Sequence, residues 1–155
     1  MHICGIDSSS KNLAIVSFED GKLGNFLLLK SNEKNTTKRI FKLCSIFEKE
    51  ILNFSPNLVV IESSIYVSNY KSSQVLAEMI GNIKYICQKN NILIESVSNK
   101  TWKKQIIGNG NASKDEIKKW VVSHYPELEG SDQDLLDACC ICLFGVKNNV
   151  GEINV

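Results

Sequence analysis

A run of four apolar residues, Leu58 to Ile61, ends directly at an acid, Glu62. A continuous apolar run of this length is typical of a central strand that is covered on both faces, as parallel strands are. Pro56 stands just before the run and ends the helical pattern that precedes it. The run therefore predicts a buried parallel strand in a layered α/β fold, with a carboxylate at its carboxyl end.

Hydrophobic periodicity and turn residues divide the rest of the chain into strands and helices. Short apolar runs predict strands at 2–7, 12–18, 22–29, 57–62 and 92–97. Helical spacing and capping residues predict helices at 36–54, about 75–87, Ser113 to about 123, and Ser131 to about 146. Segment 98–107 is basic with one tryptophan, and 126–130 is a turn. The order predicts an α/β fold with a mixed five-stranded sheet, three antiparallel strands and then two parallel ones, flanked by helices.

The composition fits one ordinary domain, residues 1–155, with 43% hydrophobic residues and a formal net charge of only +1. Bulk charge therefore indicates neither a nucleic-acid nor a membrane partner, and any such partner must meet a local patch. The longest apolar run, 138–146, is far shorter than the roughly 20 residues of a membrane-spanning helix. With no secretory signal visible, we expect a cytosolic protein.

Six cysteines inside apolar segments, without C-x-x-C spacing, are expected to be reduced and buried.

Four acids stand where an α/β fold places functional side chains. Asp7 ends the first strand and Glu62 ends the buried one, so both carboxylates are expected at the carboxyl edge of the sheet. Asp134 and Asp137, three residues apart near the start of the last helix, share one helical face. Clustered carboxylates with few histidines suit Mg²⁺ or Mn²⁺, and two such ions can hydrolyse a phosphodiester by in-line displacement.

Each acid also has a simpler explanation. Asp7 precedes a serine-rich turn and can be an Asx-turn residue, while Glu62 can lie in a solvated loop. Asp134 completes a capping box with Ser131 and can serve only the helix terminus. Asp137 is harder to explain in this way, because apolar residues flank it on a helix built for burial.

The motifs Gly5-Ile-Asp7, Val60-Ile-Glu62 and Asp134-Leu-Leu-Asp137-Ala, in this order, resemble the RuvC-type Holliday-junction resolvases of the RNase H-like superfamily. The likeness spans nearly the whole chain. Segment 103–114 is similar to that family's Lys, Gly-x-Gly, Lys segment. The family's offsets from Glu62 are matched by Asn69, Ser72 and Gly81. The Lys- and Asn-rich composition favours a phage or otherwise divergent member.

The resemblance implies an RNase H-like nuclease that cuts two opposed strands of a four-way DNA junction, leaving a 5′-phosphate and a 3′-hydroxyl. It implies that two Mg²⁺ or Mn²⁺ ions are held by four catalytic acids, Asp7, Glu62, Asp134 and Asp137. It also implies a homodimer, which is physically reasonable because one acidic cluster cannot cut both strands at once. No nucleotide cofactor and no membrane partner are expected.

Lysines suited to the DNA backbone are concentrated in segment 98–120, which has six of them against two acids. The resemblance implies that Lys103 and Lys114 contact phosphates, and we expect Lys104 to do the same. Alternatively, these lysines form only a solvated helix face.

Aromatic residues provide fewer candidates for DNA contacts than the lysines do. The family places an aromatic wedge three residues after its glutamate, where this chain has Ile65, so Tyr66 is the nearest candidate for a DNA contact by stacking. Trp102 and Trp120 are expected to pack in or near the core rather than stack on bases.

Several other functions share these features. An RNA·DNA hybrid nuclease or a broad flap and branch nuclease would use the same acids, since substrate choice depends on surface shape. Gly5-Ile-Asp7 followed by serines also resembles the phosphate-clasping turn of sugar-kinase or actin-like proteins, although that fold normally needs two such lobes. A catalytically silent junction-binding protein is disfavoured by the complete set of four acids.

Overall fold

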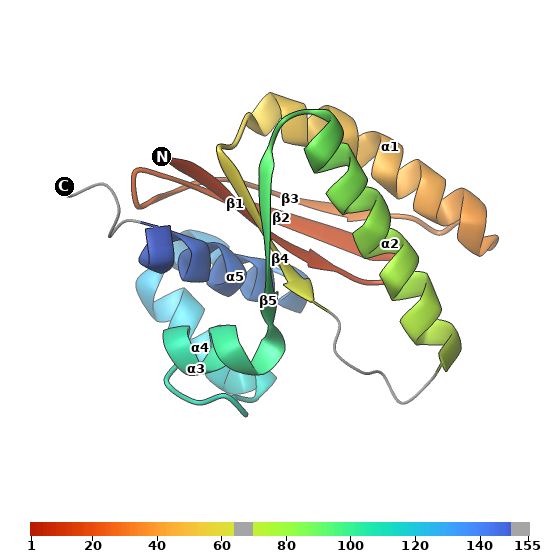
Figure 1. Ribbon diagram of the computed structural model, residues 1–155. Coiled ribbons are helices and arrows are strands. Elements are labelled where there is room, and N and C mark those ends of the chain that lie inside the picture. The colour runs from red at the N-terminus through yellow and green to blue at the C-terminus, as the bar shows by residue number, and fades with distance from the viewer. Residues whose placement is uncertain (64–69, 150–155) are drawn as a thin grey trace.

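The computed structural model describes residues 1–63 and 70–149 (Figure 1). Its strands are β1 (His2–Ser8), β2 (Asn12–Glu19), β3 (Lys22–Lys30), β4 (Leu58–Ser63) and β5 (Leu93–Ser98). Its helices are α1 (Thr36–Phe54), α2 (Tyr70–Lys89), α3 (Asn99–Ile106), α4 (Lys114–His124) and α5 (Gln133–Asn149), with a 3₁₀ turn at Pro126–Leu128. Within the described ranges, none of these helices has the length and apolar character needed to cross a bilayer.

The sheet has the strand order β3-β2-β1-β4-β5. Strand β2 pairs antiparallel with β1 and β3, whereas β4 is parallel to both β1 and β5. The predicted mixed sheet is therefore confirmed. Because Ile6 of β1 is paired with Ile61 of β4, the next residues, Asp7 and Glu62, are neighbours at the carboxyl edge.

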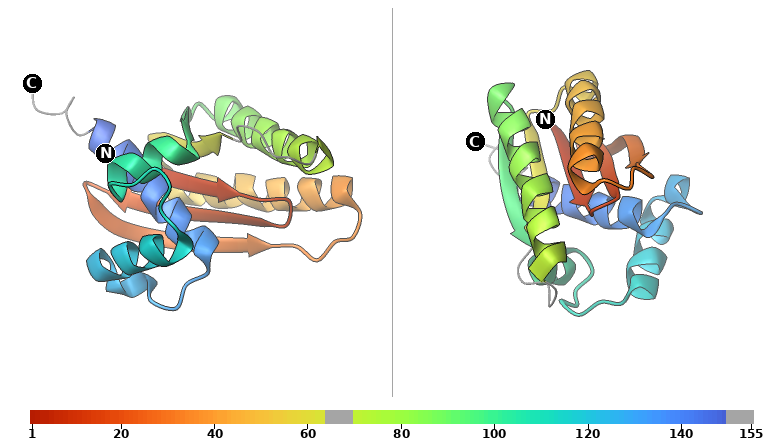
Figure 2. Two further views of the ribbon diagram at one scale, coloured as in Figure 1. Left: turned by 90° about the horizontal axis from the view of Figure 1, so that it is seen from below. Right: turned by 90° about the vertical axis from the view of Figure 1, so that its right-hand side faces the viewer.

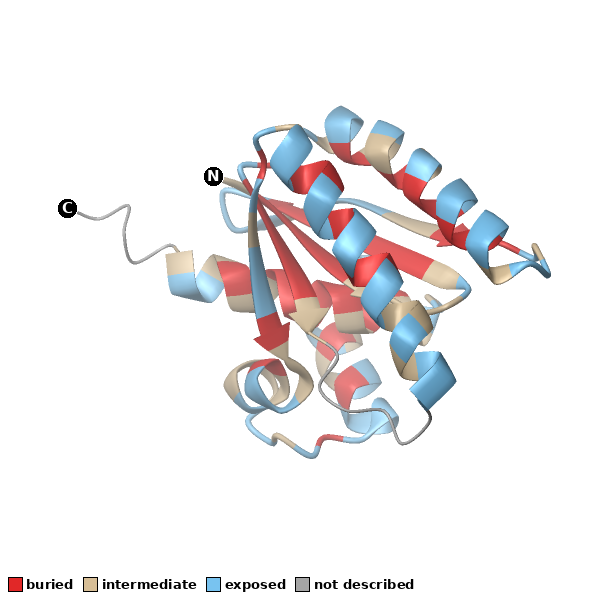
Figure 3. Ribbon diagram, turned by 45° about the vertical axis from the view of Figure 1, so that its right-hand side comes forward, coloured by how far each residue is buried: buried red, intermediate tan, exposed pale blue. Residues whose placement is uncertain are grey.

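Helices cover both faces of the sheet, with α1 and α2 on one face and α5 on the other (Figure 1 and Figure 2). Side chains along a strand point to alternate faces, so each strand contributes to two cores. In β4, Val59 and Ile61 pack on the α1 and α2 side, whereas Leu58 and Val60 pack on the α5 side. All four are buried, as predicted for a strand covered on both faces (Figure 3).

The six cysteines are free and buried in these two cores, as predicted. Burial raises the pKa of Cys44 to about 11 and that of Cys139 to about 12. Thiols with such values are neutral at physiological pH, which fits a packing role.

Two elements differ from the prediction. Helix α3 occupies the basic segment after β5, where no helix was predicted, because its two large apolar residues, Trp102 and Ile106, are too few to establish a helical periodicity. Helix α5 begins at Gln133, two residues after the predicted Ser131 cap. The side chain of Asp134 accepts a hydrogen bond from Asn12 of β2 instead of completing a capping box. The capping box predicted for Ser113 and Glu116 is present at the start of α4.

Candidate active site

Asp7 and Glu62 lie at the same edge and on the same face of the sheet. Asp7 continues the alternation that places Ile3 of β1 on the α5 side, and Glu62 does the same after Leu58 and Val60 of β4. Both residues are half-buried. The predicted meeting of two carboxylates at the end of adjacent parallel strands is thus present in the fold.

Asp134 and Asp137 reach this edge from the start of α5. The helix lies directly on β1 because Gly5 has no side chain there. A Cβ on Gly5 would be 2.3 Å from both the carbonyl oxygen of Ala138 and the backbone nitrogen of Cys142. This backbone-to-backbone approach places the first turns of α5 against the carboxyl end of β1.

The four carboxylates interact electrostatically. Burial raises the pKa of Asp7 well above its ordinary value of 3.8, and the charges of Asp137, Glu62 and Asp134 raise it further. Burial also raises the pKa of Asp137 to about 6, a value that the Gln133 hydrogen bond and the nearby Lys103 keep from rising more. We call Asp7, Glu62, Asp134 and Asp137 the acidic cluster.

Side-chain amides hold the two acids of α5. Asn12 Nδ2 donates to Asp134 Oδ2 at 2.9 Å, and Gln133 Nε2 donates to Asp137 Oδ1 at 2.7 Å. The neighbouring Asp132 has a different role, because its exposed carboxylate pairs with Lys30 of β3 at 2.6 Å. These contacts distinguish Asp134 from Asp132, as the shared helical face with Asp137 predicted.

Glu62 is held from α3. Trp102 Nε1 donates to Glu62 Oε2 at 2.6 Å, and Asn99 Nδ2 lies 3.1 Å from Oε2 and 3.3 Å from Oε1. Sequence reasoning placed Trp102 in the core, where it is, but missed this bond. The available signal was that the N–H of a buried tryptophan needs an acceptor, and the nearest strand-end acid is Glu62.

Within residues 1–63 and 70–149, no three His, Cys, Asp or Glu side chains are arranged around a common point that could hold a metal ion. Three of the four carboxylates of the acidic cluster instead face the N–H donors described above. The chemistry of the donor set nevertheless fits a hard divalent cation. Its candidate ligands are all carboxylate oxygens, the cysteines are buried in the cores, and burial together with mutual repulsion raises the pKa of Asp7.

The lysines predicted to contact DNA lie at different distances from the acidic cluster. Lys103 lies near Asp137, and its Nζ is 5.5 Å from the centre of the Trp102 ring. Lys104 is exposed on α3, and Lys114 is exposed at the first position of α4, beyond the loop in which Gly108 adopts a positive φ of 90°. Tyr66 lies outside the described residues.

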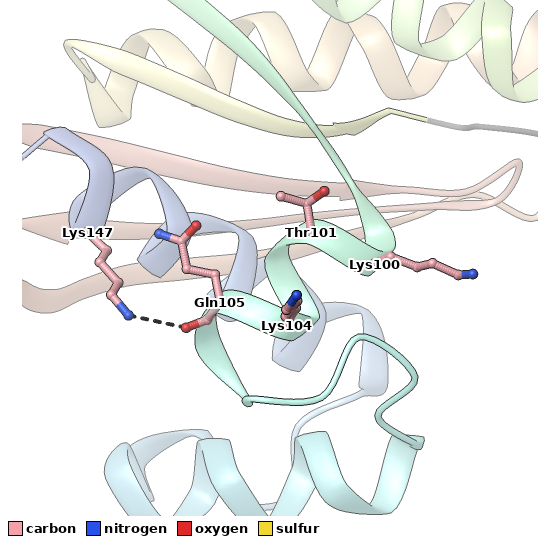
Figure 4. Close-up of a pocket in the computed structure, with 5 residues that line it drawn as sticks. All are labelled: Lys100, Thr101, Lys104, Gln105 and Lys147. Atoms are coloured by element: carbon pink, nitrogen blue, oxygen red, sulfur yellow. Dashed lines mark hydrogen bonds between the residues drawn. The ribbon is translucent and has the colours of Figure 1, made fainter.

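A basic pocket of about 510 Å³ lies between α3 and the end of α5 (Figure 4). Its lining residues are Lys100, Thr101, Lys104, Gln105 and Lys147. Lys147 donates to the backbone carbonyl of Gln105 at 3.3 Å, which ties the two helices together. Three lysines around one hollow provide a surface suited to an anionic partner. We call this surface the lysine pocket.

Comparison with known proteins gives one consistent family. The family model described as crossover junction endodeoxyribonuclease RuvC matches residues 3–144. The protein of that name from Rickettsia akari is 32% identical over 122 residues, covering 76% of this chain and 78% of the relative. That from Brachyspira hyodysenteriae is 29% identical over 140 residues, covering 90% and 84%. The structure of Thermus thermophilus RuvC in complex with a Holliday junction substrate superposes with a TM-score of 0.84 at 18% identity, covering 97% of this chain and 96% of that one.

Proposed function

This chain belongs to the RuvC family of crossover junction endodeoxyribonucleases, and from that premise we propose that it resolves four-way DNA junctions as a homodimer with the acidic cluster as its active site. The family implies a divalent-metal-dependent nuclease. We assign two Mg²⁺ or Mn²⁺ ions to each cluster. Branched DNA inside a bacterial or phage-infected cell would place its action in the cytoplasm.

One observation supports this site most directly: the pKa of Asp7 responds to burial and to the charges of the three other acids. Like charges in a partly buried place repel each other unless a cation lies between them. Structural carboxylates are usually paired with Arg or Lys instead, whereas among the described residues no acid of the cluster forms a salt bridge, although the charge of Lys103 acts on Asp137. The cluster is therefore better explained by metal binding than by fold stability.

The residues of the chain have separable roles in this proposal. Asp7, Glu62, Asp134 and Asp137 would hold the ions, which when bound supply a nucleophilic water and neutralise charge on the phosphodiester. Lys103 would contact the reacting or adjacent phosphate, because it approaches the cluster from α3. The four acids are half-buried, which would limit the access of bulk water to a phosphate bound there.

The lysine pocket would contact the backbone of a junction arm. Lys100 and Lys104 are one helical turn apart on α3, and Lys147 approaches from α5, so the pocket presents several positive charges at one place. Contacts with phosphates give affinity and orientation without sequence preference. Cleavage-site preference would then depend on other parts of the surface.

A panel of end-labelled DNAs tests this function. Four-way, forked, flapped and linear duplexes, with an RNA·DNA hybrid, are incubated with the protein and Mg²⁺ or EDTA. We expect paired nicks at symmetric positions of opposed strands on the four-way substrate alone, lost in EDTA. Cutting of forks and flaps at equal rates would replace the resolvase assignment with a general branch nuclease. Cutting of the hybrid alone would assign an RNase H-type activity, and binding without cutting would assign a junction-binding protein.

A further inference from the structure

The carboxylate of Glu62 is engaged on both oxygens by side chains of α3. Oε2 accepts the indole N–H of Trp102 at 2.6 Å, and the amide of Asn99 approaches both oxygens at 3.1 and 3.3 Å. Both donors come from the first half of a helix that begins directly after β5, the strand paired with β4. The helix that holds Glu62 is therefore linked to β4 through β5, which pairs with β4 and leads directly into α3.

Trp102 is placed firmly enough to act as a fixed donor. Its side chain is fully buried in the core formed with α5, so the indole cannot follow a carboxylate that changes rotamer. The indole nitrogen can only donate, and a buried donor without an acceptor is costly. Glu62 is therefore the acceptor that satisfies Trp102, and Trp102 fixes the direction of Glu62.

We propose that Trp102, assisted by Asn99, is a positioning residue that fixes the Glu62 carboxylate for divalent-metal binding. This inference rests on the proposed function. Side chains that donate hydrogen bonds to metal ligands orient them, and their loss typically weakens metal binding by about 10–100-fold. A glutamate has three rotatable side-chain bonds, so without these donors Glu62 would have to be ordered by the metal itself.

The test compares Trp102→Phe, which keeps an aromatic ring but removes the N–H, with Trp120→Phe as a matched control. Trp120 stacks on His124 at 4.1 Å and is not bonded to the acidic cluster. Calorimetric titration of DNA-free protein with Mn²⁺ should show about 10–100-fold weaker binding for Trp102→Phe and little change for Trp120→Phe. With junction DNA, kcat at low Mg²⁺ should fall, higher Mg²⁺ should partly restore it, and KM for the junction should stay near the native value.

Fluorescence gives a second readout that leaves Trp102 intact. In the Trp120→Phe protein the remaining tryptophan emission comes from Trp102, whose N–H touches Glu62. Saturating Mg²⁺, which is not itself a quencher, should change this emission, and Glu62→Gln should remove the response. If Trp102→Phe does not fold, this experiment and Asn99→Ala still test the proposal.

Native Mn²⁺ affinity and native Mg²⁺ dependence in Trp102→Phe would overturn the proposal, as would a Trp102 emission that does not respond to saturating Mg²⁺. Glu62→Gln separates this failure from failure of the proposed active site. If Glu62→Gln loses metal binding and cleavage while Trp102→Phe does not, only the positioning role is wrong. If Glu62→Gln keeps both, the assignment of Glu62 to the active site is wrong as well.

Discussion

Asn12 of β2 donates a 2.9 Å hydrogen bond to Oδ2 of Asp134 on α5, joining residues that are 122 positions apart in the chain. Asp132, two residues earlier, instead pairs with Lys30 at the surface. The same stretch of chain therefore presents one acid to the cluster and one to solvent, which gives a matched pair for mutation.

Asp134→Asn should lower junction cleavage at least about 100-fold, because a metal-ligand charge contributes several kcal/mol to stabilisation of the transition state. Asp132→Asn removes only an exposed ion pair, worth about 0–1 kcal/mol, and should cleave normally. The measurement is the single-turnover rate on a labelled four-way junction. Equal rates for the two variants would show that the distinction between these acids is wrong.

The pKa of Asp137, which burial raises to about 6, predicts how stability varies with pH in metal-free protein. Between its ordinary value of 3.8 and about 6, the folded state binds more protons than the unfolded state. Stability from this group is therefore present at low pH and is lost as pH rises through that window. Asp137→Asn should be about 1–3 kcal/mol more stable than the native protein at pH 7.5, and the difference should vanish near pH 4.

Urea unfolding in EDTA, from pH 4 to 7.5, measures this difference. The asparagine carbonyl can still accept the hydrogen bond from Gln133, so packing is largely retained. A variant that is less stable than the native protein at pH 7.5 would contradict the conclusion that burial disfavours the ionised form of Asp137 in metal-free protein. Added Mg²⁺ should reverse the order by stabilising the native protein more than Asp137→Asn.

Gly5 should not tolerate a side chain, because a Cβ there would be 2.3 Å from the backbone of α5 at two points. Gly5→Ala must push α5 away from β1, and this should cost about 2 kcal/mol or more and lower the Tm by about 5 °C or more. Gly81→Ala is the control. A Cβ at Gly81 meets no atom within 4 Å, and alanine in a helix interior should stabilise α2 by up to about 1 kcal/mol.

Thermal unfolding of the two variants checks this contrast. Cleavage by Gly5→Ala should also fall at temperatures where it remains folded, because Asp134 and Asp137 move with α5. A Gly5→Ala protein with native Tm and native activity would disprove the close packing of α5 on β1.

The strand-end acids were predictable from sequence because one local rule covers both, namely that parallel strands end at the same edge of a sheet. The placement of Asp134 and Asp137 on one face of the last helix was predictable too, from their spacing of three residues. Helix α3 was missed, since a short basic helix with only one pair of apolar residues, Trp102 and Ile106, carries too little apolar periodicity to be recognised. Its bond from Trp102 to Glu62 depends on the angle between that helix and β4, which no local pattern encodes.

The lysine pocket should contribute to DNA affinity through phosphate contacts. Lys100→Gln with Lys104→Gln should weaken junction binding and reduce the slope of log K against log salt by up to about 2, since each phosphate contact contributes about 0.9. Lys42→Gln with Lys49→Gln, exposed on α1 across the sheet, provides a control of equal charge change. Identical salt slopes for the two double variants, measured by fluorescence anisotropy, would remove the pocket from the DNA interface.

The most direct test of the account is a comparison of native protein with Asp7→Asn on a labelled four-way junction, in Mg²⁺ and in EDTA, with junction binding measured on the same samples. Asp7 is the acid on which all three others act, so its loss should abolish cleavage. Binding in EDTA should stay near the native level, because in the proposed function lysines rather than the acidic cluster contact the DNA backbone. Symmetric nicking by the native protein in Mg²⁺ alone, with an inactive but junction-binding Asp7→Asn, is the predicted result. Native-level cleavage by Asp7→Asn would contradict the proposed active site.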